Sequence, residues 1–168
     1  MRVLGIDPGV AITGYALLEG DGDDARLIAS GVITTATGCP LPRRLLVMHE
    51  ELKTLIARCQ PEAAAAEELF FARNARTALA VGHGRGVALL TLAEAGLQVY
   101  EYTPMQVKQA VAGYGRASKE QVQEMIRLLL RLPAALEPDD AADAAAVALC
   151  HLHSRRLNSL LAGAKVEG

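Results

Sequence analysis

A short apolar run that stops at an aspartate constrains the fold of this chain more than any other feature. Residues 3–6 form the run, Asp7 follows it, and Pro8 and Gly9 end it before a second apolar run begins. Short apolar runs bounded by turn residues are typical of buried strands. The pattern therefore predicts a strand over 2–8 with a carboxylate at its end, although by itself an aspartate there can equally serve only to start a turn.

The succession of periodic segments predicts one α/β domain. Three strands with short connections open the chain, which predicts an antiparallel meander, and helices alternate with strands after them. We expect a mixed five-stranded sheet flanked by helices, with a single domain over 1–163 and a short flexible tail over 164–168. The predicted strands are 2–8, 13–19, 25–35, 62–69 and 97–102, and the predicted helices are 42–59, 74–95, a short one opened by Pro104, 118–132 and 139–162.

Composition excludes a membrane protein and a disulfide scaffold. Cys39, Cys59 and Cys150 are scattered and form no C-x-x-C pair, which favours reduced structural thiols. The sequence has no run of 18 apolar residues, and it opens on a strand pattern rather than on a signal peptide. We therefore expect a soluble, cytoplasmic protein with no membrane partner.

Charge is unevenly distributed along the chain, whose formal net charge is −2. Residues 1–72 carry 6 Lys and Arg against 10 Asp and Glu, whereas residues 73–119 carry 6 against 2. A basic middle beside an acidic beginning would suit a phosphate-binding surface next to an acidic metal pocket. Ordinary solvated faces would give the same counts, so charge alone does not decide.

Three further carboxylates could join Asp7. Glu67 and Glu68 end the fourth predicted strand, where alternation turns one of them toward a pocket and the other away. Asp140 and Asp143 stand three residues apart in the first turn of the last helix and share a face, although the helix dipole favours acids there in any case. Converging carboxylates are tolerated when divalent cations neutralise them. Oxygen ligands suit Mg²⁺ or Mn²⁺, and two such ions can drive phosphodiester hydrolysis.

Several segments, in order and over nearly the whole chain, form a specific set. They are Leu4-Gly5-Ile6-Asp7-Pro8-Gly9 with Thr13-Gly14-Tyr15, Glu67 followed by Phe70, Arg85-Gly86-Val87-Ala88, Gln106-Val107-Lys108-Gln109 and Asp140-Ala141-Ala142-Asp143. Together they resemble the RuvC family of Holliday-junction resolvases. The first segment alone is shared with other ribonuclease-H-like proteins and with sugar-kinase and actin-type ATPases. The resemblance implies a ribonuclease-H-like fold. It also implies a homodimer that cuts four-way DNA junctions, with the helix that holds residues 82–86 at the dimer interface.

The resemblance also implies the acids of the active site. Asp7, Glu67, Asp140 and Asp143 match the family's metal-binding catalytic acids, with two Mg²⁺ or Mn²⁺ ions per site. Glu68 would face away. The reaction would leave 5′-phosphate and 3′-hydroxyl ends, in homologous recombination and DNA repair.

The DNA contacts follow from the same resemblance. Phe70 matches an aromatic residue that contacts bases at the junction centre, and Arg73 and Arg76 follow it as expected phosphate contacts. Lys108 and Lys119 match lysines near the scissile phosphate, and Lys119 would also stabilise developing negative charge. The family acts with the branch-migration proteins RuvA and RuvB.

Other functions remain compatible with parts of the sequence. A sugar-kinase-type phosphotransferase would use Asp7 and Gly9 around a nucleotide phosphate, but it needs two lobes. A ribonuclease H proper would cut RNA–DNA hybrids, and a junction-binding module would bind without cleaving. Cys150, His151 and His153 have the look of metal ligands, but histidines two residues apart on a helix do not face one ion.

Overall fold

The computed structural model describes the backbone of residues 1–68 and 75–164, and the side chains there except at Asp23, 75–77 and 158–164. Within these residues five strands form one sheet: β1 (Arg2–Asp7), β2 (Ile12–Glu19), β3 (Arg26–Thr34), β4 (Ala63–Glu67) and β5 (Gln98–Tyr102). Their order across the sheet is β3-β2-β1-β4-β5. The first three pair antiparallel, and β1, β4 and β5 pair parallel. The predicted mixed sheet with an opening meander is confirmed.

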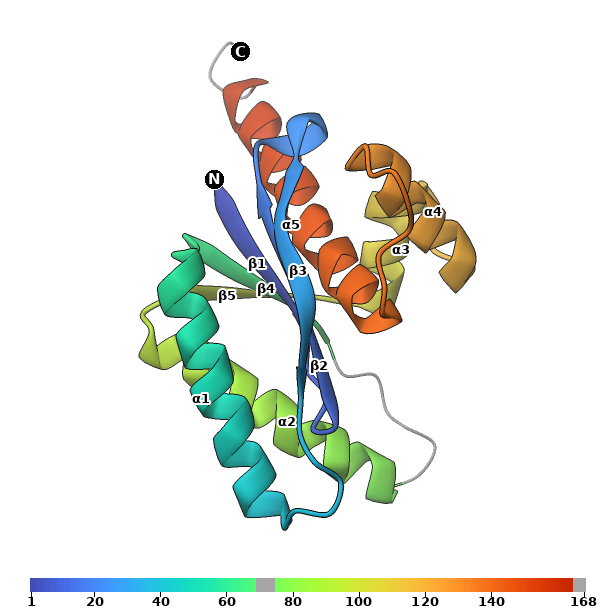
Figure 1. The fold of residues 1–168 in the computed structure, drawn as a ribbon. Coiled ribbons are helices and arrows are strands. Elements are labelled where there is room, and N and C mark those ends of the chain that lie inside the picture. Colours follow the sequence, from blue (N-terminus) through green and yellow to red (C-terminus); the bar gives the residue numbers. More distant parts are fainter. Residues whose placement is uncertain (69–74, 165–168) are drawn as a thin grey trace.

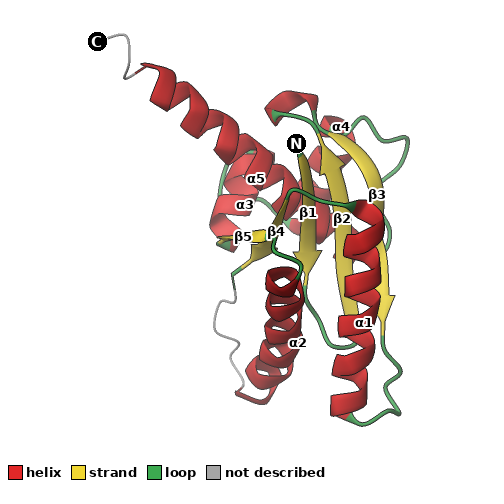
Figure 2. Ribbon diagram, turned by 90° about the vertical axis from the view of Figure 1, so that its left-hand side faces the viewer, coloured by secondary structure: helices red, strands yellow, loops and turns green. Residues whose placement is uncertain are grey.

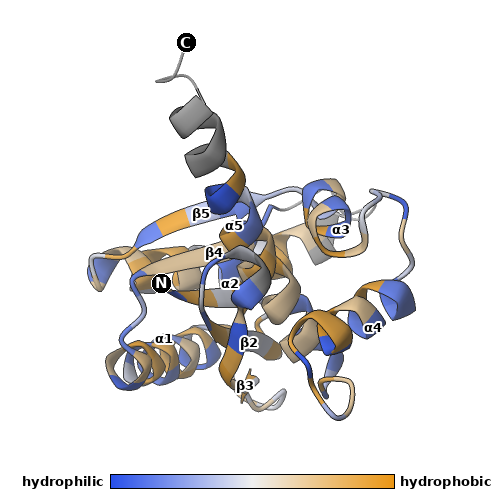
Figure 3. Cartoon of the chain, turned by 90° about the horizontal axis from the view of Figure 1, so that it is seen from above, coloured by the Kyte–Doolittle hydropathy of each residue, from blue (hydrophilic) through white to orange (hydrophobic). Residues whose placement is uncertain are grey.

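Helices cover both faces of the sheet (Figures 1 and 2). On one face lie α1 (Leu41–Cys59) and α2 (Ala75–Glu94), and on the other lie α3 (Pro104–Ala112), α4 (Lys119–Leu129) and the long α5 (Asp139–Ala164). Figure 3 looks along the layers and shows hydrophobic and hydrophilic residues alternating along α1 and α4, as expected of helices with one buried face. The architecture is a three-layer α/β/α domain.

Successive residues of the strands alternate between two hydrophobic cores. Leu4 packs in the core beneath α1 and α2, whereas Val3 and Ala65 pack in the core beneath α3, α4 and α5. Side chains alternate faces along a strand. The odd-numbered Asp7 and Glu67 at the strand ends therefore project from the α5 face.

Two glycines let α5 lie directly on the backbone of the sheet. A Cβ at Gly5 would overlap the carbonyl oxygen of Ala144, and a Cβ at Gly14 would overlap that of Asp140. Small side chains on α5 complete this close approach, since its buried residues include Ala141, Ala142, Ala144, Ala145, Ala146 and Ala148. The first turn of α5 is consequently held against β2.

Most predicted boundaries lie within two residues of the observed ones, but α4 is shorter than predicted. It ends at Leu129 instead of 132, because the chain turns at Arg131 in the left-handed conformation, with φ of 55°. The helix begins as predicted, with Ser118 and Gln121 forming a capping box. The last helix continues to Ala164, two residues beyond the predicted end.

Glycines at positions 82, 84 and 86 do not interrupt α2, which is continuous over Ala75–Glu94.

None of the helices in the described part of the chain is both long enough and apolar enough to cross a membrane. The division into a domain over 1–163 and a tail over 164–168 stays a prediction, and residues 165–168 lie outside the described residues.

Candidate active site

Two of the predicted acids end adjacent parallel strands. Ile6 on β1 is in register with Ala66 on β4, so the next residues, Asp7 and Glu67, stand side by side at the same edge of the sheet. Both project from the face that α5 covers. The parallel pairing of β1 with β4 thus joins carboxylates that are 60 positions apart in the sequence.

The first turn of α5 brings the other two acids to this edge. Gly14 pairs with Asp7 across the β1–β2 ladder, and the backbone of Asp140 packs against Gly14. Asp143 lies one turn further along α5 and lines a cavity of about 170 Å³ together with Asp7 and Glu67. The four predicted acids therefore occupy one edge of the sheet, three of them on one cavity.

The charges of these acids act on one another. Burial, followed by the charges of Asp143 and Asp140, raises the pKa of Asp7 to about 6. Burial, followed by the charges of Asp7 and Asp143, raises the pKa of Glu67 to about 7. Burial also raises the pKa of Asp143, against the opposing effect of Lys119. The site crowds negative charge in a partly dehydrated position.

Lysines border the acids on the side of α3 and α4. Glu67 and Asp143 also line a second cavity, of about 300 Å³, together with Lys108 and Lys119. Lys119 Nζ donates to Asp143 Oδ2 at 3.1 Å and lies 3.2 Å from Asp139 Oδ2. The two predicted lysines therefore line one cavity with Glu67 and Asp143, and Lys119 also binds Asp143 directly.

Sequence reasoning missed Asp139 as a part of this edge. It holds Lys119 and accepts a hydrogen bond from Gln123 at 2.9 Å. As the first residue of α5, next to the Asp140–Asp143 pair, it could have been found from its place in the sequence.

Sequence reasoning also missed Arg85, although it stands in one of the segments singled out. Arg85 Nη1 donates to the main-chain carbonyl of Glu67, and Nη2 pairs with Glu101 on β5.

Glu68 was expected to face away from the site, but it lines the 170 Å³ cavity together with Asp7, Glu67 and Asp143. It lies beyond the end of β4, so the alternation of side chains along the strand no longer sets its direction.

Some predicted contacts lie outside the described residues. Phe70 and Arg73 belong to the stretch 69–74, and Arg76 lies in α2 but its side chain is not described. Their roles stay predictions.

The histidines of α5 face different elements. His151 Nδ1 lies 2.8 Å from the hydroxyl of Tyr102 on β5, and His153 Nδ1 lies 3.0 Å from the carbonyl oxygen of Ala110 on α3. The Nδ1 atoms of the two rings thus contact different elements, β5 and α3.

The acids fit a hard divalent cation in chemistry, but they are not assembled around one. Among the described residues, no three His, Cys, Asp or Glu side chains stand so that they could hold a metal ion as they lie. Their oxygen donors are those that Mg²⁺ and Mn²⁺ prefer. Burial and the neighbouring acids raise the pKa values of Asp7 and Glu67 more than the nearby lysines, Lys119 for Asp7 and Lys108 for Glu67, lower them. Holding an ion would require the side chains to turn toward one another.

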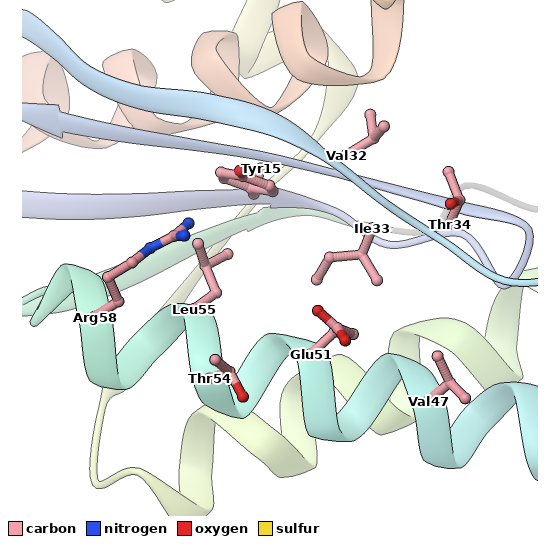
Figure 4. Close-up of a pocket in the computed structure, with 9 residues that line it drawn as sticks. All are labelled: Tyr15, Val32, Ile33, Thr34, Val47, Glu51, Thr54, Leu55 and Arg58. Carbon is pink, nitrogen blue, oxygen red and sulfur yellow. The ribbon is translucent and has the colours of Figure 1, made fainter.

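A larger hollow, of about 410 Å³, lies between α1 and the strands β2 and β3 (Figure 4). Its lining includes Tyr15, Thr34, Glu51 and Arg58, with Glu51 as the single carboxylate. One carboxylate facing mixed polar and apolar residues gives no metal-binding or acid–base constellation. The acid-lined edge, and not the roomier hollow, is the candidate active site.

Comparisons with known proteins show which family the chain resembles. A family model described as "Crossover junction endodeoxyribonuclease RuvC" matches residues 3–151. The crossover junction endodeoxyribonuclease RuvC of Chloroflexus aggregans is 56% identical over 154 residues, which cover 92% of this chain and 94% of the relative. That of Thermomicrobium roseum is 54% identical over 160 residues, covering 95% and 98%.

Solved structures give the same result. The Thermus thermophilus RuvC in complex with Holliday junction substrate superimposes with a TM-score of 0.90 and 42% identity, covering 94% of this chain and 96% of that chain. The yeast mitochondrial Holliday junction resolvase Ydc2 shares the fold, with a TM-score of 0.67 and 17% identity over 94% of this chain and 82% of its own.

Proposed function

The chain belongs to the RuvC family of crossover junction endodeoxyribonucleases, and from this premise we propose that it resolves four-way DNA junctions by paired, metal-assisted hydrolysis of phosphodiester bonds. The observation that carries the mechanism is the meeting of Asp7, Glu67 and Asp143 on one cavity. Bound divalent cations neutralise the negative charges of crowded carboxylates such as these, whose pKa values are raised.

Two Mg²⁺ or Mn²⁺ ions per site would supply neutralising charge and a lowered pKa for the attacking water. Asp7, Glu67, Asp140 and Asp143 would hold them. Hydrolysis forms a bond from the water oxygen to phosphorus and breaks the bond from phosphorus to O3′, which leaves 5′-phosphate and 3′-hydroxyl ends. The Lys119 ammonium, at the edge of the acid cluster, would stabilise the negative charge that builds on the phosphate oxygens.

A homodimer would present two such sites to the near two-fold symmetry of a junction. An exposed apolar stripe on α2 supports this proposal, because Leu79 and Leu90 are 65% and 57% exposed. Gly86 lies between them at helical spacing, and a Cβ there would meet nothing within 4 Å. Exposed large apolar side chains on one helix face are typical of an association surface.

Further partners follow from family membership. Lys108 would contact the phosphate near the cut, and Phe70, Arg73 and Arg76 would contact the junction. We place the enzyme in the cytoplasm, in recombination and repair, together with the branch-migration proteins RuvA and RuvB.

The proposal is tested with a synthetic four-way junction, a linear duplex of the same sequence and an RNA–DNA hybrid, each with Mg²⁺ or Mn²⁺. Paired nicks in the junction alone, on strands of like polarity, are the expected result. Cutting of the hybrid alone would support the ribonuclease H alternative. Binding of the junction without any cut, under either metal, would support the non-catalytic one.

A further inference from the structure

Arg85 crosses from α2 to the ends of two strands. Its Nη1 donates to the main-chain carbonyl oxygen of Glu67, and its Nη2 pairs with the carboxylate of Glu101 on β5. The side chain is only 12% exposed. Withdrawing a guanidinium from water costs free energy unless its donors are used, and here two of them bind fixed groups of the strand ends.

The ladder of the sheet does not provide a partner for the Glu67 carbonyl. The N–H of Glu68 donates to Tyr102 on β5 at 2.8 Å, so the main-chain groups of the preceding residue point the other way, toward β1. In the β1–β4 register, the next donor on β1 would be the N–H of residue 8. That residue is Pro8, which has no N–H to donate.

We propose that Arg85 is a positioning residue for the active site: it supplies the hydrogen bond that Pro8 cannot, and so fixes the peptide unit that directs the Glu67 carboxylate toward Asp7. This inference rests on the proposed function, in which Glu67 holds a metal ion. The peptide after Glu67 lies at the very end of β4. Without Arg85 its orientation would be held from the β5 side alone.

The same turn of α2 supports the other acid-bearing strand end. A Cβ on Gly84 would lie 3.0 Å from the main-chain nitrogen of Val10, in the turn that follows Asp7. Adjacent residues of α2 thus contact the chain beyond Asp7 and the carbonyl of Glu67. The position of α2 is therefore set against both strand ends, and Arg85 is its polar link to them.

The test compares Arg85→Met with Arg127→Met, a matched control in α4 whose arginine also forms an ion pair, with Glu124. Mn²⁺ binding to the metal-free protein is measured by calorimetry, and junction cleavage is measured against Mg²⁺ concentration. Loss of a residue that orients a metal ligand lowers metal affinity about tenfold to a hundredfold. We expect this in Arg85→Met, with junction affinity measured without metal unchanged, and no change of metal affinity in Arg127→Met.

The double variant Pro8→Ala with Arg85→Met makes the test specific, because an alanine at position 8 supplies a backbone N–H where proline has none. We expect the double variant to regain metal affinity relative to Arg85→Met, whereas a general loss of packing at Arg85 would not be restored. Unchanged Mn²⁺ affinity in folded Arg85→Met overturns the inference, and so does a double variant no better than Arg85→Met. Failure of the wild-type protein to cut junctions would instead overturn the proposed function.

Discussion

The helices α1 and α5 pack on opposite faces of one sheet in different ways. Large side chains separate α1 from the strands, with Met48, Leu52 and Leu55 buried between them, and a hollow of about 410 Å³ lies beside β2 and β3. By contrast, α5 meets the sheet through alanines, and Gly5 and Gly14 bring the two backbones together. The hollow is thus on the α1 side, and the acids are on the α5 side.

This difference shows that one helix mainly stabilises the fold, whereas the other fixes the positions of acidic residues. A layer of leucines can shift by fractions of an ångström and still exclude water, whereas two backbones in contact have one fitting arrangement. Asp140 and Asp143 stand on the helix that is fixed in this way. We therefore expect changes on the α1 side to alter stability, and changes on the α5 side to alter cleavage.

The largest effect on stability is expected on the α1 side, from Leu52→Ala. Leu52 is fully buried, and its truncation should lower the free energy of unfolding by about 2–5 kcal/mol. The rate of junction cleavage per folded molecule should be unchanged. Urea unfolding and cleavage at a temperature where the variant stays folded check both statements. A cleavage loss beyond the unfolded fraction would show that α1 also positions the acids.

On the α5 side, Gly14→Ala should reduce cleavage about a hundredfold, because the added Cβ displaces the backbone of Asp140 from Asp7. The overpacking should cost about 1–3 kcal/mol of stability as well. Gly38→Ala is the control, since a Cβ there meets nothing within 4 Å. Normal cleavage by folded Gly14→Ala would contradict the importance of the close approach.

The raised carboxyl pKa values make the metal-free protein sensitive to pH. Asp7, with a pKa of about 6, and Glu67, with a pKa of about 7, bind protons more tightly in the folded than in the unfolded chain. The free energy of unfolding should therefore fall as pH rises from about 4 to about 7. Unfolding titrations in a chelator, across this range, measure it.

Asp7→Asn removes the part of this loss of stability that comes from the ionised Asp7 carboxylate. The variant should be more stable than the wild type at pH 8 by about 1–3 kcal/mol, and equal to it near pH 4, where the wild-type carboxyl is protonated. Added Mg²⁺ should stabilise the wild type and not the variant. A stability difference that is the same at both pH values would mean that the charge of Asp7 is not the cause.

The smallest effect is expected from Lys119→Met, which should slow cleavage about tenfold, because one charge-assisted hydrogen bond contributes about that much. The Mg²⁺ requirement should not rise, because Asp143 loses a competing partner. Lys53→Met, at an exposed position of α1, is the control. A higher Mg²⁺ requirement in Lys119→Met would place the lysine among the groups that support metal binding.

The sequence predicted the strands, the helices and the places of the four acids at strand and helix ends because these depend on local signals. The apolar run before Asp7 and the i, i+3 spacing of Asp140 and Asp143 are visible in short windows. The antiparallel meander follows from short connections. The convergence of the acids required the family resemblance, because no local signal pairs β1 with β4.

The remaining features depend on contacts that local patterns do not record. Arg85 acts on a main-chain carbonyl from another element, and its role follows only when the β1–β4 register places Pro8 beside Glu67. The end of α4 was missed because a non-glycine residue, Arg131, takes the left-handed conformation. Glu68 could not be placed by alternation because it lies past the end of its strand.

Cleavage and binding of one four-way junction by Asp7→Asn is the most direct test of an active site centred on Asp7. If Asp7 holds the divalent cations, the variant will bind the junction as the wild type does and will not cut it at any Mg²⁺ concentration. Wild-type cleavage by the variant, or a loss of junction binding as large as the loss of cleavage, would contradict that role.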